Sequence, residues 1–110
     1  MAITSEGNDL FIAAMGAVLW YKMRDGQYTL SSNIPCSPRQ ILLSDKGLLV
    51  NMGINGISML VIKGEVIKES WNNSLPFSPH LIVTDIEWDY LLCLPQNKGE
   101  NLYIIRLRGL

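Results

Sequence analysis

Histidine and cysteine, the residues that most often supply metal ligands and nucleophiles, are nearly missing from this chain. Its 110 residues include one histidine and two cysteines, Cys36 and Cys93, which lie far apart. A zinc site needs about three or four protein ligands, usually at short spacings. We therefore expect no metal site and no cofactor. Two isolated cysteines do not form a disulfide framework, so we expect reduced, buried thiols in a cytoplasmic protein.

Charge is also scarce, and its two signs are balanced. Lys and Arg number 9 against 10 Asp and Glu, which gives a net charge of −1. Nucleic-acid binding needs a positive surface, and the sequence has no basic cluster, so we expect no nucleic-acid partner. The longest apolar stretch, residues 10–21, includes Gly16 and is too short to span a bilayer. We therefore expect no membrane span.

The motifs of common catalytic sites are missing as well. The sequence has no Gly-x-Ser-x-Gly elbow and no phosphate-binding loop. A Ser-His-Asp triad would have to use His80, the one histidine, and nothing singles out its partners. Asp45, Asp85 and Asp89 lie in equivalent short connections, where carboxylates favour turns by bonding nearby backbone. The sequence therefore predicts a protein that is not an enzyme.

The sequence does contain one pattern that occurs nearly three times. A short apolar run, an acidic turn and a second apolar run occur at residues 3–12, 42–50 and 83–92. A Pro-x-Ser-Pro block occurs at 35–38 and again at 76–79. A period of about 40 residues is typical of repeat architectures. We expect one β-repeat module over the whole chain, with units at about residues 1–39, 40–80 and 81–110.

Short β-branched and aromatic runs separated by turn residues predict strands along the whole chain. Asp25-Gly26 and Asn55-Gly56 are dipeptides that favour tight turns between strands. Prolines in the connections between units exclude helix there. The pattern indicates an all-β fold of repeated four-stranded antiparallel meanders. The predicted strands are at about residues 2–4, 10–15, 18–24, 27–31, 40–43, 48–52, 57–62, 65–70, 81–84, 90–94 and 102–107.

Four-stranded units of about 40 residues resemble the blades of a β-propeller of the broad WD40-like or citron-homology-like kind. The resemblance rests on the period and the hairpin layout, and it covers the whole chain. It implies two full blades and most of a third. No Gly-His pair opens a unit, and Trp88-Asp89 lies in a first hairpin connection instead of closing a third strand. The subfamily is therefore unassigned.

A propeller of this size has a closure problem. Closed propellers contain about four to eight blades, and unpaired sheet edges favour association with another chain. We therefore expect the module to be part of a larger or oligomeric propeller. Its partner would be another protein chain or further copies of the same chain.

A second fold is compatible with the N-terminal third of the sequence. Residues 9–24 form a helix in this interpretation, capped by Asn8 or Asp9 and containing the helix-tolerant Ala13 and Ala14. The result would be an α+β domain resembling roadblock-like or longin-like interaction modules. Gly16 interrupts such a helix, and its apolar residues leave no polar face.

These features together predict a noncatalytic protein–protein interaction scaffold. In a propeller, the connections between units share one face with those between second and third strands. Residues 33–39, 53–56, 72–80 and 95–101 would form that face here. The predicted contact residues on or beside it are Arg39, Trp71, His80 and Lys98, with Trp71 expected just beyond a strand end.

The alternative function is an oligomeric, lectin-like propeller that binds a glycan or another small ligand. Such a protein would repeat aromatic and polar side chains at equivalent positions of its units. The aromatic content of this chain is only 8%, which gives this alternative little support.

Overall fold

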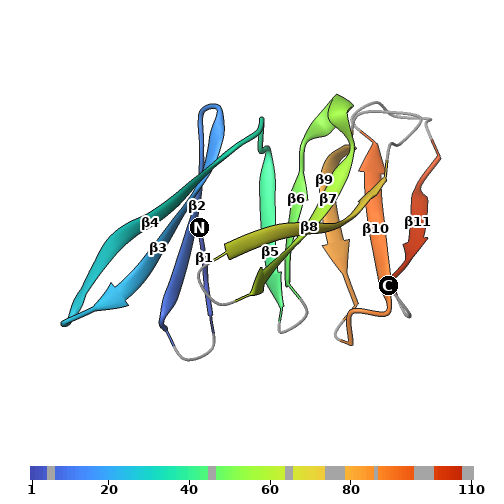
Figure 1. Cartoon of the computed structure of the whole chain (residues 1–110). Coiled ribbons are helices and arrows are strands. Elements are labelled where there is room, and N and C mark those ends of the chain that lie inside the picture. Colours follow the sequence, from blue (N-terminus) through green and yellow to red (C-terminus); the bar gives the residue numbers. More distant parts are fainter. Residues whose placement is uncertain are drawn as a thin grey trace.

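The computed structural model of the chain describes residues 1–4, 7–44, 47–63, 66–73, 79–85, 87–95 and 101–107. In this part the chain forms eleven strands in three antiparallel sheets (Figure 1). The first sheet contains β1 (Ala2–Ile3), β2 (Asp9–Ala14), β3 (Ala17–Arg24) and β4 (Gln27–Pro35). The second contains β5 (Gln40–Ser44), β6 (Gly47–Asn51), β7 (Ile57–Lys63) and β8 (Val66–Asn73), with the 3-10 turn η1 (Gly53–Asn55) before β7. The third contains β9 (Pro79–Thr84), β10 (Tyr90–Pro95) and β11 (Tyr103–Arg106).

Each sheet is a meander in which consecutive strands pair with each other. The all-β class and the predicted grouping of strands into four, four and three are therefore confirmed. The helix over residues 9–24, and with it the α+β alternative, is wrong. β2 and β3 form a hairpin whose turn contains Gly16 at φ 81°, and Phe11 and Val18 are both buried. A helix at the surface of a protein needs a polar face, which this segment lacks, whereas a hairpin needs to bury only one face of each strand.

Both predicted turn dipeptides lie between strands. Asp25 and Gly26 join β3 to β4 with φ of 51° and 80°, the positive pair that a type I′ hairpin turn requires. Asn55 and Gly56 lie between β6 and β7, but the connection is longer than a two-residue hairpin because η1 forms there. This extra turn places Ile54 outside the sheet, at one end of the molecule.

The outer hairpins of the first two sheets have the same register. Trp20 lies opposite Ser32 in the first sheet and Met59 opposite Trp71 in the second, a displacement of 39 residues in both strands (20 to 59 and 32 to 71). In each ladder the following pair skips one residue of the outer strand, so the β-bulge also recurs at the same place. The sequence repeat is therefore also a structural repeat in these two sheets.

The core consists of two layers, one on each side of the second sheet. In β6, Leu48 faces the first sheet and Leu49 faces the third, since neighbouring strand residues point to opposite faces. The layer between the first two sheets is formed by Phe11, Val18, Trp20, Ile41, Leu48, Val50 and Leu60. The layer between the second and third is formed by Leu49, Ile57, Met59, Ile82, Leu91, Cys93, Ile105 and Leu107.

Hydrogen bonds also join the second and third sheets. The side-chain amide of Gln40 in β5 donates to the carbonyl oxygen of Ile82 at 2.9 Å and accepts from the Ile82 N–H at 2.8 Å. β9 is an edge strand of its sheet, so these backbone groups have no β10 partner on that side. Gln40 thus pairs with the open edge much as a neighbouring strand would.

The three sheets lie side by side along the long dimension of the molecule (Figure 1), whose extents are 50 × 29 × 19 Å. In the described residues, no helix combines the length and the apolar character needed to cross a membrane. The main contacts between sheets join β1 to β5 and β9 to β6 and η1, so each sheet packs on its neighbour in chain order.

Candidate functional site

A groove with a volume of about 610 Å³ opens on one side of the stack, where strands of the first two sheets end, beside the junction of these sheets. Three connections line it: the β2–β3 turn, the link from β4 to β5 and the link from β6 to β7. We call it the connection groove. Clefts of about 300–1,000 Å³ are the usual size for ligand sites. Its lining residues are Ala14, Met15, Gly16, Ser37, Pro38, Arg39, Met52, Gly53, Ile54 and Asn55.

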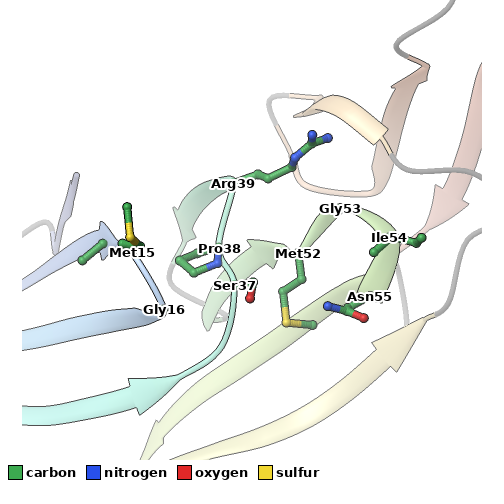
Figure 2. Close-up of a pocket in the computed structure, with 10 residues that line it drawn as sticks. Met15, Gly16, Ser37, Pro38, Arg39, Met52, Gly53, Ile54 and Asn55 are labelled. Atoms are coloured by element: carbon green, nitrogen blue, oxygen red, sulfur yellow. The ribbon is translucent and has the colours of Figure 1, made fainter.

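Two large apolar side chains stand at the borders of this groove. Met15 is 102% exposed and Ile54 is 83% exposed, the highest values among the exposed large apolar residues of the described chain. Figure 2 shows them on opposite sides of the group, with Pro38 and Ser37 between them. Both lie in connections that contain glycine and project beyond the sheets. Apolar side chains that are exposed to solvent beside a groove are typical of an interaction site.

The side of the groove nearest the third sheet is held by a hydrogen-bond network. Asn51 is fully buried, and its side-chain oxygen accepts the N–H of Gly53 at 3.0 Å. Its side-chain amide donates to the carbonyl oxygen of Pro79 at 3.5 Å, and its carbonyl accepts the N–H of Arg39 at 2.7 Å. The guanidinium of Arg39 donates to the same Pro79 oxygen at 3.3 Å. These hydrogen bonds therefore hold the connections that line the groove against the ends of packed strands.

The structure places the four predicted contact residues in different surroundings. Arg39 is exposed and lines the connection groove. His80 is exposed in β9, next to the residue that accepts the Arg39 hydrogen bond. Trp71 is half-buried and packs against the core between the second and third sheets. Lys98 lies outside the described residues.

The expectation that Trp71 lies beyond the end of its strand is wrong. β8 continues to Asn73, and Trp71 pairs with Met59 inside the ladder. The pairing continues past residue 70 because a bulge absorbs the extra residue there. Trp71 as a binding residue stays a prediction, and its packing against the core makes a structural role sufficient.

Sequence reasoning missed Met15 and Met52 as lining residues, because both fell inside predicted strands, at residues 10–15 and 48–52. Ile54 lay within the predicted face but was not singled out as a contact residue. The predicted face did include residues 33–39 and 53–56. The structure brings parts of these two segments together at the connection groove.

Metal ligands and thiols are the reactive groups to consider in the described residues. Within the described ranges, no three His, Cys, Asp or Glu residues are placed to hold a metal ion. Burial raises the pKa of the Cys93 thiol to about 11, and burial also raises the pKa of Cys36. The thiolate is the reactive form, so both cysteines are unreactive thiols at neutral pH. The connection groove offers apolar side chains, a cation, a hydroxyl and an amide.

No protein-family model, no characterised protein and no solved structure matches the chain. Its function is therefore inferred from its own geometry: the connection groove, the network beneath it and the exposed faces of its sheets.

Proposed function

We propose that this chain is a noncatalytic protein–protein interaction scaffold built from propeller-type blades, and that its connection groove docks a segment of another protein. The observation that carries the proposal is the convergence of three connections on one open groove bordered by Met15 and Ile54. Three successive meanders, two of which share register and bulge, support the blade-like interpretation. Propellers present such connections together on one face, where partners bind.

The side chains of the groove indicate the chemistry of the docked segment. Covering Met15 and Ile54 removes apolar surface from water, at about 25 cal/mol per Å². Methionine and arginine are enriched at protein interfaces, and arginine binds carboxylates with charge-assisted hydrogen bonds. The exposed Arg39 therefore favours an acidic residue beside apolar ones. We expect a partner segment with two apolar side chains close to an Asp or Glu.

The support beneath the groove favours binding without a large rearrangement. Asn51 and Pro79 hold two of the three connections through hydrogen bonds between strand ends. A site that is already ordered loses less conformational entropy when a partner docks. Such placement of binding residues on connections over a packed β scaffold is common in interaction domains.

Selection from a displayed library of random peptides tests this proposal with a defined probe. We expect the enriched peptides to carry apolar residues next to Asp or Glu, and to bind the purified chain in calorimetric titration. Met15→Asp and Ile54→Asp should each weaken binding at least tenfold, which is about 1.4 kcal/mol. Both substitutions place a carboxylate where the peptide's own acidic and apolar groups would lie.

Met23→Asp is the matched control, because Met23 is an exposed methionine at the other end of β3. It should leave peptide affinity within twofold of the wild type. Equal losses for Met23→Asp and Met15→Asp would place binding elsewhere on the chain. Specific binding on a glycan array with no peptide enrichment would favour the lectin-like alternative and overturn this proposal.

A further inference from the structure

The outer face of the third sheet is mostly apolar and is uncovered in the described chain, with the exposed pair Tyr90 and Arg106 at one margin. Ile82, Leu91 and Ile105 point into the core, so their strand neighbours point the opposite way. Val83, Leu92 and Ile104 form a row across all three strands. Val83 is 38% exposed and Ile104 is 58% exposed. We define the third-sheet end face as Leu81, Val83, Leu92, Leu94 and Ile104.

The same face of the two preceding sheets is covered by the next sheet. Trp20 and Met59 occupy equivalent positions in the repeated register. Trp20 of the first sheet packs against the second, and Met59 of the second packs against the third. The repeat itself therefore shows what covers a face of this kind, namely another sheet of the same repeat.

The opposite end of the stack carries the matching surface. Ile3, Leu10, Tyr21 and Leu30 form a row across all four strands of the first sheet, on the side away from the second. Ile3 is 47% exposed and Leu30 is 56% exposed. We define the first-sheet end face as Ile3, Leu10, Ile12, Leu19, Tyr21 and Leu30. In the second and third sheets, the equivalent face receives the preceding sheet.

We infer that the third-sheet end face of one copy docks on the first-sheet end face of a second copy, so that two copies close head to tail into a ring of six sheets. The inference rests on the propeller-type repeat proposed above. The described residues of one copy form three sheets, and closed propellers contain about four to eight blades. Two copies bring six such sheets together, which lies within that range, whereas three copies bring nine. A head-to-tail contact that closes by rotation gives a ring, in which both end faces are buried.

Light scattering coupled to size-exclusion chromatography on the full chain tests the stoichiometry. We expect a discrete species at twice 12.3 kDa. A species that stays at 12.3 kDa over the accessible concentrations would overturn the inference. A ladder of larger assemblies would also overturn it, because it would show that the head-to-tail contact does not close with two copies.

Substitutions on the two end faces test which surfaces meet. Ile104→Lys and Leu30→Lys lie on opposite end faces of the stack, and both sites are exposed enough to leave the fold intact by circular dichroism. Each should raise the dimer dissociation constant at least tenfold, because each places a charge in one partner surface. Val83→Lys is a second variant of the third-sheet end face, with the same expected result.

Asn72→Lys is the control, since it adds the same charge at an exposed position of β8, outside both end faces. It should leave the dimer unchanged. A dimer broken by Ile104→Lys but not by Leu30→Lys would overturn the head-to-tail contact, because it would show two third sheets facing each other.

The failure of this inference is distinguishable from that of the proposed function. Monomeric Ile104→Lys should still bind the selected peptides, because the connection groove lies outside both end faces. Dimers without peptide binding would remove the docking function and leave the ring in place. Peptide binding by a strictly monomeric wild-type chain would remove the ring and leave the docking function in place.

Discussion

At the scale of the residue, Gly47 lies in a close contact with the backbone of the neighbouring strand. It lies in β6 at φ 147°, and a Cβ there would be 2.6 Å from the carbonyl oxygen of Leu60 and 3.0 Å from the sulfur of Met59. Atoms that close must move apart, and the Leu60 oxygen belongs to the backbone of the neighbouring strand. Gly47 therefore permits β6 and β7 to approach as they do.

We predict that Gly47→Ala lowers the free energy of unfolding by about 2 kcal/mol or more, from backbone strain plus the clash with β7. Gly26→Ala is the matched control, because Gly26 has φ 80° but no atom within 4 Å of its Cβ position. It should cost about 1 kcal/mol, the strain alone. Urea unfolding followed by tryptophan fluorescence measures both. Equal decreases in the free energy of unfolding of the two variants would show that the contact with Leu60 does not affect stability.

Individual residues were predictable where local pattern decides their place. Trp20 lies within the strand predicted at residues 18–24, and its side chain is fully buried, stacked on Phe11 and donating to Asp9 at 2.8 Å. Arg39 was singled out from its connection and does line the groove. Met15 and Ile54 were not singled out, since their importance depends on three connections that meet only after the first two sheets have packed together.

At the scale of the element, the side chain of Gln40 links the second and third sheets by hydrogen bonding to the backbone of the edge strand β9. Its two hydrogen bonds to Ile82 satisfy groups on the open edge of β9. Without them, a partly buried N–H and C=O would lose their partners, which costs about 1–3 kcal/mol for each such group. The attachment of β9 to the second sheet thus depends on a side chain as well as on the apolar core.

We predict that Gln40→Leu speeds hydrogen exchange of the Ile82 amide by at least tenfold, beyond any change in the most protected amides of β7. Leucine keeps a comparable volume but can neither donate to nor accept from Ile82. Gln27→Leu is the control, since Gln27 is exposed at the β3–β4 turn. Unchanged protection of Ile82 in Gln40→Leu would show that β9 is held by apolar packing alone.

The strands themselves were the most predictable elements. Their alternating residues and turn dipeptides are local signals, and Asp25-Gly26 forms the type of turn expected of it. The end of β8 was missed because a bulge cannot be read from alternation: one extra residue shifts the pattern, and Trp71 then appears to follow the strand. The link from Gln40 to β9 was missed because it joins residues 42 positions apart.

At the scale of the whole molecule, three meanders packed one on the next explain both the core and the exposed surfaces. The second sheet is buried on both sides, whereas the outer sheets each leave an apolar face uncovered in the described chain. The period in the sequence predicted this succession of units. It did not predict which faces meet, because the alternating residues of β6 are apolar on both sides.

The connection groove follows from the same succession. Neighbouring sheets bring the β2–β3 turn, the β4–β5 link and the β6–β7 link to the same strand end of the stack, along the upper edge in Figure 1. The central claim is that this end binds a partner segment through Met15, Arg39 and Ile54. The support for this claim is the position of these residues at the groove, so the most direct test is to locate the bound peptide on the chain.

That test is nuclear magnetic resonance mapping of the isotope-labelled chain during titration with a peptide enriched in the selection. The groove account predicts chemical-shift changes concentrated at residues 14–16, 37–39 and 52–55, with smaller changes along β5 and β6. Shift changes confined to the end faces, in β4 or β11, with these three segments unaffected, would contradict it.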